Sequence, residues 1–217
     1  MLISDFLLNT YKKEEWEKIF MHTQYHRLKL ASLDFSESAF KQTSLRSAHV
    51  EGINFNSSRI RNSDFSIANL NKSDFSKANI KSCNFFKSHM KKSLFVGSLI
   101  SQSNMKDMRV WRSNFKHSCI EKTSFSNSDL DGSCFEDAQI NECSFANTTL
   151  RESNFRDAKI GNTSFYGAHL DRCDLRGADL SQSNLESAYL RGCLYNSYTR
   201  LPITKAQAEE SGMIFTY

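Results

Sequence analysis

The side chains that most often do chemistry are present in this chain, but they do not follow a catalytic or metal-binding spacing. The 217 residues include six histidines and six cysteines, and no pair of them has the separation typical of zinc ligands. His49, His89 and His169 are isolated from one another in the sequence. The chain has neither a glycine-rich phosphate loop nor a nucleophile elbow. The sequence therefore predicts no enzymatic activity, no metal site and no cofactor.

A repeat accounts for these scattered polar residues. Every fifth residue from Leu30 to Tyr195 is large and apolar, with no insertion or slip. The position two residues earlier is nearly always Ser, Ala, Thr or Cys, and the position between is mostly Asp, Asn or Ser. Two clear examples are Ser73-Asp74-Phe75-Ser76-Lys77 and Ala178-Asp179-Leu180-Ser181-Gln182. A period of five fits neither an α-helix nor an ordinary strand, so it indicates a repeat architecture.

This unit resembles that of the pentapeptide-repeat family, whose motif is A(D/N)LXX. The resemblance covers about 165 residues in unbroken register. It implies an all-β fold, a right-handed parallel quadrilateral β-helix with four pentads in each coil.

Elementary geometry supports this fold. Two residues that are two apart on an extended segment point to the same side, so each pentad can turn its small and its large residue inward. One coil buries little by itself, and neighbouring coils must stack to complete a core. Residues twenty apart should then form columns, such as the one from Phe35 through Phe75 to Phe155. With about 4.8 Å between coils, roughly eight coils would make a rod about 40 Å long.

The ends of the chain differ from the repeats, and we expect three regions: a helical cap over 1–26, the β-helix over 27–199, and a C-terminal helix with an apolar tail over 200–217. Residues 4–21 have the pattern of an amphipathic helix. Thr204 and Gly212 have the residue types that begin and end a helix. The tail that follows, Met213, Ile214 and Phe215, either covers the last coil or forms a homodimer. Quinolone-resistance members of the family have a similar tail, which dimerises.

Cysteine usage favours a reducing compartment. Cys83, Cys143, Cys173 and Cys193 fall in the small inward position, where they replace Ser or Ala. Stacked parallel neighbours such as Cys173 and Cys193 point the same way, which suits a disulfide poorly. There is no long apolar run and no basic stretch of the kind that begins a secretory signal. We expect a soluble bacterial protein of the cytoplasm.

Charge is unevenly distributed along the chain. Residues 27–122 contain 17 Lys and Arg against 7 Asp and Glu, a balance of +10, whereas residues 123–195 contain 6 against 11, a balance of −5. The terminal segments contribute −1 and 0, which gives the net charge of +4. Such an asymmetry steers partners rather than setting the fold, although it can also arise by chance on a solvated surface.

Several outward positions between residues 86 and 112 break the polar rule of the repeat. The apolar residues are Phe86, Leu94, Val96, Leu99 and Trp111, and the nearby cations are Lys72, Lys91, Lys92, Arg109 and Arg112. Apolar and aromatic residues together with arginine are typical of an interface core. The sequence therefore predicts a partner-binding patch here, with a locally degenerate repeat as the alternative.

Two functions compete. The first is a non-enzymatic protein-interaction scaffold or regulator whose partner is unknown. The second follows from the resemblance, since some pentapeptide-repeat proteins mimic DNA and protect DNA gyrase and topoisomerase IV from quinolones or peptide toxins. Against it, a DNA mimic needs carboxylates in place of phosphates, and this chain is net basic. Direct nucleic-acid binding is disfavoured because the cations are spread over several faces with few aromatics placed for stacking.

Overall fold

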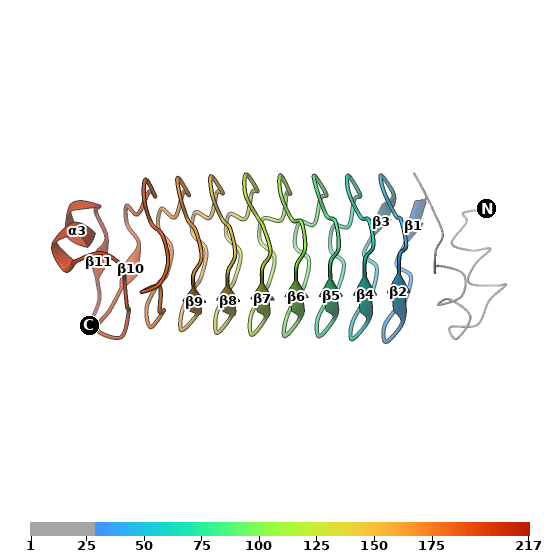
Figure 1. The fold of residues 1–217 in the computed structure, drawn as a ribbon, viewed down its shortest axis with the longest axis horizontal. Helices are drawn as coiled ribbons and strands as arrows, with labels where there is room; N and C mark the ends of the chain where they lie inside the picture. Colours follow the sequence, from blue (N-terminus) through green and yellow to red (C-terminus); the bar gives the residue numbers. More distant parts are fainter. Residues whose placement is uncertain (1–28) are drawn as a thin grey trace.

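The computed structural model describes residues 29–217, which form a rod of stacked coils (Figure 1). Each coil contributes very short extended segments joined by tight turns. The strands are β1 (Lys29–Ala31), β2 (Ala39–Lys41), β3 (His49–Glu51), β4 (Arg59–Arg61), β5 (Asn79–Lys81), β6 (Leu99–Ser101), β7 (Cys119–Glu121), β8 (Gln139–Asn141), β9 (Lys159–Gly161), β10 (Leu194–Tyr195) and β11 (Ile214–Phe215). The one regular helix of these residues is α3 (Lys205–Glu210).

All strand pairs are parallel and join residues twenty apart. The largest sheet has seven strands in the order β2-β4-β5-β6-β7-β8-β9, and single parallel bridges with the same offset connect most of the remaining coils. The predicted β-helix is confirmed. It has about nine coils rather than eight, because β11 pairs with β10 and extends the stack beyond the last repeat.

The rod has four faces, which we name by their columns of buried large residues. The columns run from Phe35 to Tyr195 on face A, from Phe40 to Leu180 on face B, from Leu45 to Leu185 on face C and from Val50 to Leu190 on face D. Each face is followed by a two-residue turn, so we call the corners the A–B, B–C, C–D and D–A edges. Faces A and C lie opposite each other across the core.

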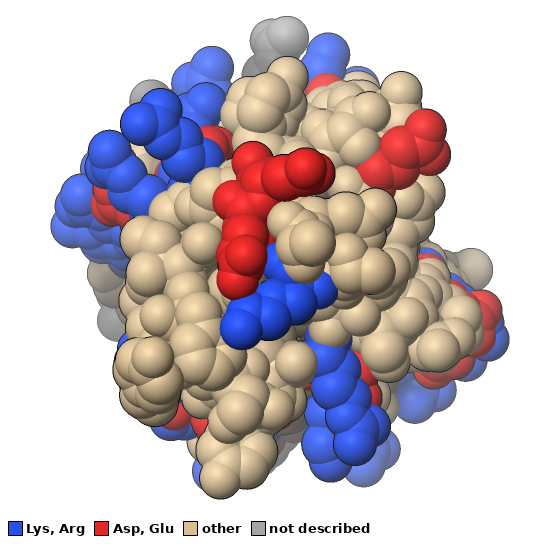
Figure 2. Space-filling model, turned by 90° about the vertical axis from the view of Figure 1, so that its left-hand side faces the viewer, with Lys and Arg blue, Asp and Glu red and all other residues tan. Residues whose placement is uncertain are grey.

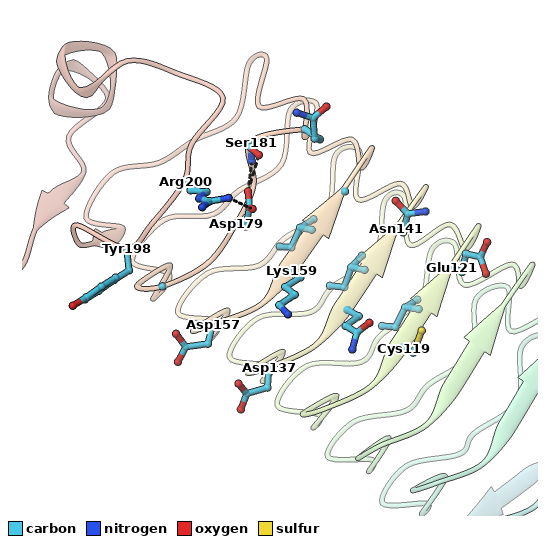
Figure 3. Close-up of a pocket in the computed structure, with 17 residues that line it drawn as sticks. Cys119, Glu121, Asp137, Asn141, Asp157, Lys159, Asp179, Ser181, Tyr198 and Arg200 are labelled. Carbon is cyan, nitrogen blue, oxygen red and sulfur yellow. Dashed lines mark hydrogen bonds and ion pairs between the residues drawn. The ribbon is translucent and has the colours of Figure 1, made fainter.

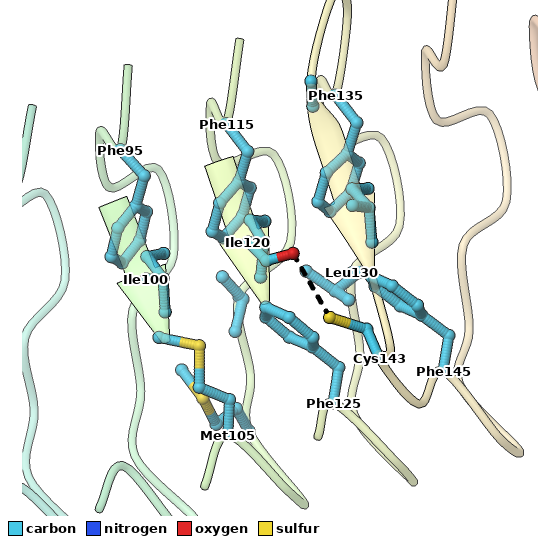
Figure 4. Packing of buried hydrophobic residues seen from close by; sticks show 14 of the residues in the cluster. Phe95, Ile100, Met105, Phe115, Ile120, Phe125, Leu130, Phe135, Cys143 and Phe145 are labelled. Atoms are coloured by element: carbon cyan, nitrogen blue, oxygen red, sulfur yellow. Dashed lines mark hydrogen bonds between the residues drawn. The ribbon is translucent and has the colours of Figure 1, made fainter. Parts of the chain in front are cut away.

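Stacked phenylalanine rings form most of faces A and C (Figure 4). The rings of Phe95, Phe115 and Phe135 are stacked with nearly parallel planes, and their centroids are 4.5 and 4.8 Å apart. The ring of Phe125 meets Phe115 edge-on from the opposite face at 6.0 Å. Both geometries are favourable for aromatic pairs. The smaller aliphatic residues of faces B and D fill the remaining space, as the sequence predicted.

Most polar side chains at the small inward position are hydrogen-bonded to backbone groups of a neighbouring coil. The Ser113 hydroxyl donates to the carbonyl of Met90 at 2.8 Å and accepts from the backbone N–H of Ser93 at 3.0 Å. Cysteine uses the same geometry, with the Cys193 thiol donating to the carbonyl of Leu170 at 2.9 Å. A serine in this core therefore leaves few unpaired groups, which explains why the repeat accepts it. The six cysteines are free thiols, and burial raises the pKa of Cys83 to about 12.

Where Asp or Asn precedes the large residue, its side chain can close the following turn. The Asp64 carboxylate accepts the backbone N–H of Ser66 at 2.9 Å, and the Asn84 amide of the next coil donates to the same carboxylate at 3.1 Å. Asn104 continues this stack by donating to Asn84 at 3.1 Å. The preference for Asp and Asn at this position is thus a local hydrogen-bond requirement.

The second turn residue of almost every pentad is in the left-handed region. Lys77 has φ of 57°, and its N–H donates to the carbonyl of Val96 in the next coil at 2.8 Å. This hydrogen bond offsets the cost of the conformation. Ile67, with φ of 61°, is unusual because a β-branched residue is strained there. Its side chain is 47% exposed, so packing does little to compensate for the strain.

The C-terminal end is closed by α3 and β11. The Thr204 hydroxyl accepts the N–H of Gln207 at 3.3 Å, and the Gln207 side chain accepts the N–H of Thr204 at 2.9 Å, which makes a capping box. The predicted helix between Thr204 and Gly212 is thus present. The predicted cap over 1–26 and its helix over 4–21 lie outside the described residues. No helix in the described part of the chain has the length and apolarity to cross a bilayer.

We expect Phe115→Ala to lower the free energy of unfolding by about 3–5 kcal/mol, because it removes a fully buried ring and leaves a cavity. Phe86→Ala is the matched control, since that ring is outward and only half-buried. Urea denaturation followed by circular dichroism measures both. Equal losses in the two variants would contradict the assignment of inward and outward columns.

Ile67→Asn should raise the free energy of unfolding by about 1 kcal/mol, because asparagine tolerates the left-handed region that strains isoleucine. Gln102→Asn is the control, since Gln102 is unbranched and has φ of 51°. Differential scanning calorimetry of the two variants makes the comparison. A gain at position 102 as large as that at position 67 would show that the strain is not specific to the branched residue.

Candidate binding surfaces

Some outward charges form ion pairs between neighbouring coils. Lys116 donates to Glu136 at 2.6 Å, and Arg172 to Glu152 at 3.3 Å, each partner being twenty residues away. The hydrogen bond from Lys116 lowers the pKa of the Glu136 carboxyl. These exposed pairs contribute little stability individually. They show that a carboxylate one coil away is the common partner of a cation on this rod.

One part of the predicted patch gathers at the D–A edge. Lys91 Nζ lies 3.9 Å from the centre of the Trp111 ring, and the Arg112 guanidinium carbon lies 5.6 Å from it. Lys92 stacks between Lys72 and Arg112 in the column of left-handed turn residues. Lys72 pairs with Glu51 at 2.8 Å. Cation–π contacts therefore give Trp111 a local structural role.

A second part of the predicted patch lies across face A, at the A–B edge and on face B. Leu94, Val96 and Leu99 follow one another within a single coil, and the exposed fractions of the two leucines are 42% and 51%. Leu94 stacks between Asp74 and Asn114 in the column of turn-closing residues. It has no oxygen to accept the N–H of Val96, as Asp74 does for Ser76 at 2.8 Å. We call these three residues the apolar edge.

The other predicted residues lie apart from the apolar edge. Phe86 is at the C–D edge, diagonally across the rod, where Lys87 Nζ lies 5.0 Å from its ring centre. Arg109 is exposed on face D between His89 and Asp129. Burial and the Arg109 cation both lower the pKa of His89. The predicted patch is thus distributed round the rod, and only its D–A and A–B parts are each compact.

A groove on the C-terminal half of face B was not predicted (Figure 3). Its volume is about 840 Å³, and it extends over β7, β8 and β9 to Arg200. Gly161 and Gly177 contribute no side chains there, which hollows the face. Asp137 and Asp157 project from turns along one side. Sequence reasoning could have noticed the two glycines, but it could not have shown the depth of the groove.

The groove does not contain a catalytic constellation. The Asp179 carboxylate accepts from the Ser181 hydroxyl at 2.7 Å and lies 3.4 Å from Arg200 Nη1. The hydrogen bonds from Ser181 and the Arg200 charge lower the pKa of Asp179, so this carboxylate is a satisfied structural group. Within residues 29–217, no three His, Cys, Asp or Glu side chains could together hold a metal ion.

The C-terminal end of the rod exposes apolar residues. The view from this end is mostly uncharged, with a small group of charged residues near its centre (Figure 2). Ile214 and Phe215 of β11 are 52% and 38% exposed. Met213, the third residue predicted to dimerise, is buried in the core of its own rod. Phe215 meets Tyr195 edge-on at 5.3 Å, so it also covers the last coil.

Comparison with known proteins identifies a protein family that matches this chain. The family model described as "Pentapeptide repeat region" matches residues 18–95 and 109–199. No curated protein matches the sequence. Among solved structures, HetL, a pentapeptide-repeat protein involved in heterocyst differentiation regulation from the cyanobacterium Nostoc sp. strain PCC 7120, has 15% identity and a TM-score of 0.51 over 80% of this chain and 87% of HetL.

A trypsin-treated form of QnrB1, a plasmid-mediated fluoroquinolone resistance protein, has 14% identity and a TM-score of 0.45 over 81% of this chain and 93% of that one. These likenesses concern the fold. The family match covers most of the chain, and its repeats coincide with the stacked columns described above. The chain belongs to the pentapeptide-repeat family.

Proposed function

We propose that this chain is a non-enzymatic, rigid interaction scaffold or regulator that binds a protein partner through the apolar edge. The observation that carries the proposal is Leu94. It occupies a position where the repeat uses Asp or Asn to close the turn, and it gives up that hydrogen bond. A leucine that is 42% exposed gains little burial in exchange. Folding alone therefore offers no reason for it, whereas a partner would.

The rod suits such a role because its surface is preorganised. Outward residues are held by backbone hydrogen bonds to a neighbouring coil, as Asn104 is when its N–H donates to the carbonyl of Cys83 and its carbonyl accepts the N–H of Phe85. A rigid surface loses little conformational entropy on binding. The D–A edge, with Trp111, Lys91, Lys92, Arg112 and Lys72, would be a second contact surface, and Phe86 and Arg109 would lie beside it.

The cytoplasm is the compartment that we propose for this scaffold. Six free thiols, four of them buried, support a reducing environment. The four buried thiols would be unreactive, since burial raises the pKa of Cys143, for example, to about 11.

Leu94→Asn separates binding from stability. We expect it to raise the free energy of unfolding by about 1 kcal/mol, because the new amide oxygen can accept the N–H of Val96. It should at the same time reduce partner capture, together with Leu99→Ser. The measurement is a pull-down from bacterial lysate, with wild type and variants side by side and recovered proteins quantified by mass spectrometry.

Phe86→Ser is the control for that pull-down, since Phe86 lies diagonally across the rod. Loss of the same captured protein in Leu94→Asn and Leu99→Ser, but not in Phe86→Ser, supports the proposal. Unchanged capture by a folded Leu94→Asn variant would refute it.

Protection of DNA gyrase and topoisomerase IV is a second candidate. The apolar C-terminal end favours it, because two rods joined there through Ile214 and Phe215 would make a long dimeric rod. The carboxylates Asp137 and Asp157 on neighbouring coils would then lie towards the junction, where a DNA mimic needs negative charge. The basic first half of the chain argues against it.

For this candidate, micromolar protein should restore gyrase supercoiling in the presence of ciprofloxacin. An Ile214→Asp/Phe215→Asp variant should then be a monomer by light scattering and should lose the protection. Absence of rescue by the wild-type chain would eliminate the candidate, and rescue by a monomeric variant would eliminate the dimer.

A further inference from the structure

Five exposed cations gather on the N-terminal half of face B. They are Lys41, Arg59, Arg61, Lys77 and Lys81, and we call them the basic cluster. Strand register places Lys41, Arg61 and Lys81 directly above one another on β2, β4 and β5. Arg59 lies on the other side of Ile60, and Lys77 occupies the adjacent A–B turn. With about 4.8 Å between coils, the cluster extends roughly 10 Å along the rod.

Like several other cations in the described part of the rod, such as Lys106 and Arg156, the basic cluster makes no ion pair. Among residues 29–217, none of its five members is within ion-pair distance of a carboxylate. Lys116, Lys122 and Arg172, by contrast, each reach a carboxylate one coil away. Like charges on directly paired strand residues are destabilising. The column Lys41–Arg61–Lys81 therefore costs stability that the fold does not require.

The basic cluster adjoins the apolar edge. Asn79 separates Arg59 from Leu99 in the strand register. Gly97, beside Val96, stacks on Lys77, since the N–H of Lys77 donates to the carbonyl of Val96 at 2.8 Å. Further along, the A–B edge carries Lys116, which is already paired with Glu136. Going along the rod, this side thus presents unpaired cations, then apolar side chains, then an ion pair.

We propose that the basic cluster and the apolar edge together bind an acidic segment of a partner protein, in which carboxylates are followed by a large apolar side chain. This inference rests on the proposed function and specifies the chemistry of the partner. Carboxylates would supply the missing ion pairs of Arg59, Arg61 and Lys81, and the apolar side chain would cover Leu99. Electrostatic complementarity of this kind sets specificity and association rate.

The same pattern disfavours a nucleic-acid duplex. Phosphates continue along a duplex in both directions, whereas the basic cluster is followed along the rod by the apolar edge and then by Lys116, which is already paired with Glu136. The basic cluster also has no aromatic residue on which a base could stack. A short acidic segment matches the extent of the cluster better.

The test uses the full chain and a fluorescein-labelled synthetic peptide of six glutamates followed by two leucines, with binding followed by fluorescence anisotropy at low salt. Arg59→Ser/Arg61→Ser/Lys81→Ser should weaken binding about tenfold, as three exposed pairs are lost. Arg46→Ser/Lys87→Ser/Lys106→Ser makes the same change in net charge on the C–D edge, diagonally across the rod, and should change affinity less than threefold. Leu99→Ser should weaken the leucine peptide but not a peptide that ends in two serines.

Three results would overturn the inference: equal losses in the two triple variants, no binding of the peptide by the folded wild type, or tighter binding of a labelled DNA duplex than of the peptide. Salt-sensitive self-association without peptide binding would assign face B to a second copy instead. A partner captured through Leu94 in variants that lack the basic cluster would refute this inference and leave the proposed function intact.

Discussion

Parallel hydrogen bonding at an offset of twenty residues is the constraint on which the rest of this molecule depends. Each coil donates to and accepts from its neighbours at fixed positions: the Phe115 N–H donates to the Cys134 carbonyl, and the Cys134 N–H donates to the Ser113 carbonyl. A residue therefore meets its own equivalent above and below. A residue type that occurs at a position in one coil must therefore be able to pack against the same type in the coils above and below. Phenylalanine can be repeated because flat rings stack, and serine can be repeated because its hydroxyl both donates and accepts. Charge of one sign cannot be repeated without cost.

That constraint makes the outside of the rod informative. Outward positions have default solutions, namely Asp and Asn stacks that close turns and ion pairs between coils, such as Asn84 with Asp64 and Lys116 with Glu136. Departures from a default cost stability in a way that can be named. Leu94 gives up a turn hydrogen bond, and Arg61 stacks between Lys41 and Lys81. The groups to which they belong meet on face B, where Arg59 of the basic cluster and Leu99 of the apolar edge lie two coils apart. Their proximity is stronger evidence for a shared use than either departure alone.

The sequence was sufficient for everything that depends on the repeat, because inward residues are set by the period alone. The phenylalanine columns, the inward cysteines and the helix after Thr204 are all as predicted. Height along the rod and position around it both follow from the coil of twenty residues. Phe86 and Trp111, which are 25 residues apart, therefore lie on neighbouring edges rather than in one patch. The groove was missed because a hollow at Gly161 and Gly177 depends on how far neighbouring side chains reach.

The end of the repeat shows what happens when the twenty-residue register is lost. After Tyr195 the register slips by one residue, so that Asp179 pairs with Arg200, and the chain then turns through Pro202 into α3. β11 returns to the twenty-residue offset only for two residues, which places Met213 inside and leaves Ile214 and Phe215 partly exposed. A single slip thus ends a solenoid whose coils could otherwise continue. At the exposed end, another chain could continue the stack of coils. A partner that binds along the sides has to contact the outward side chains, which the repeat does not use for its core.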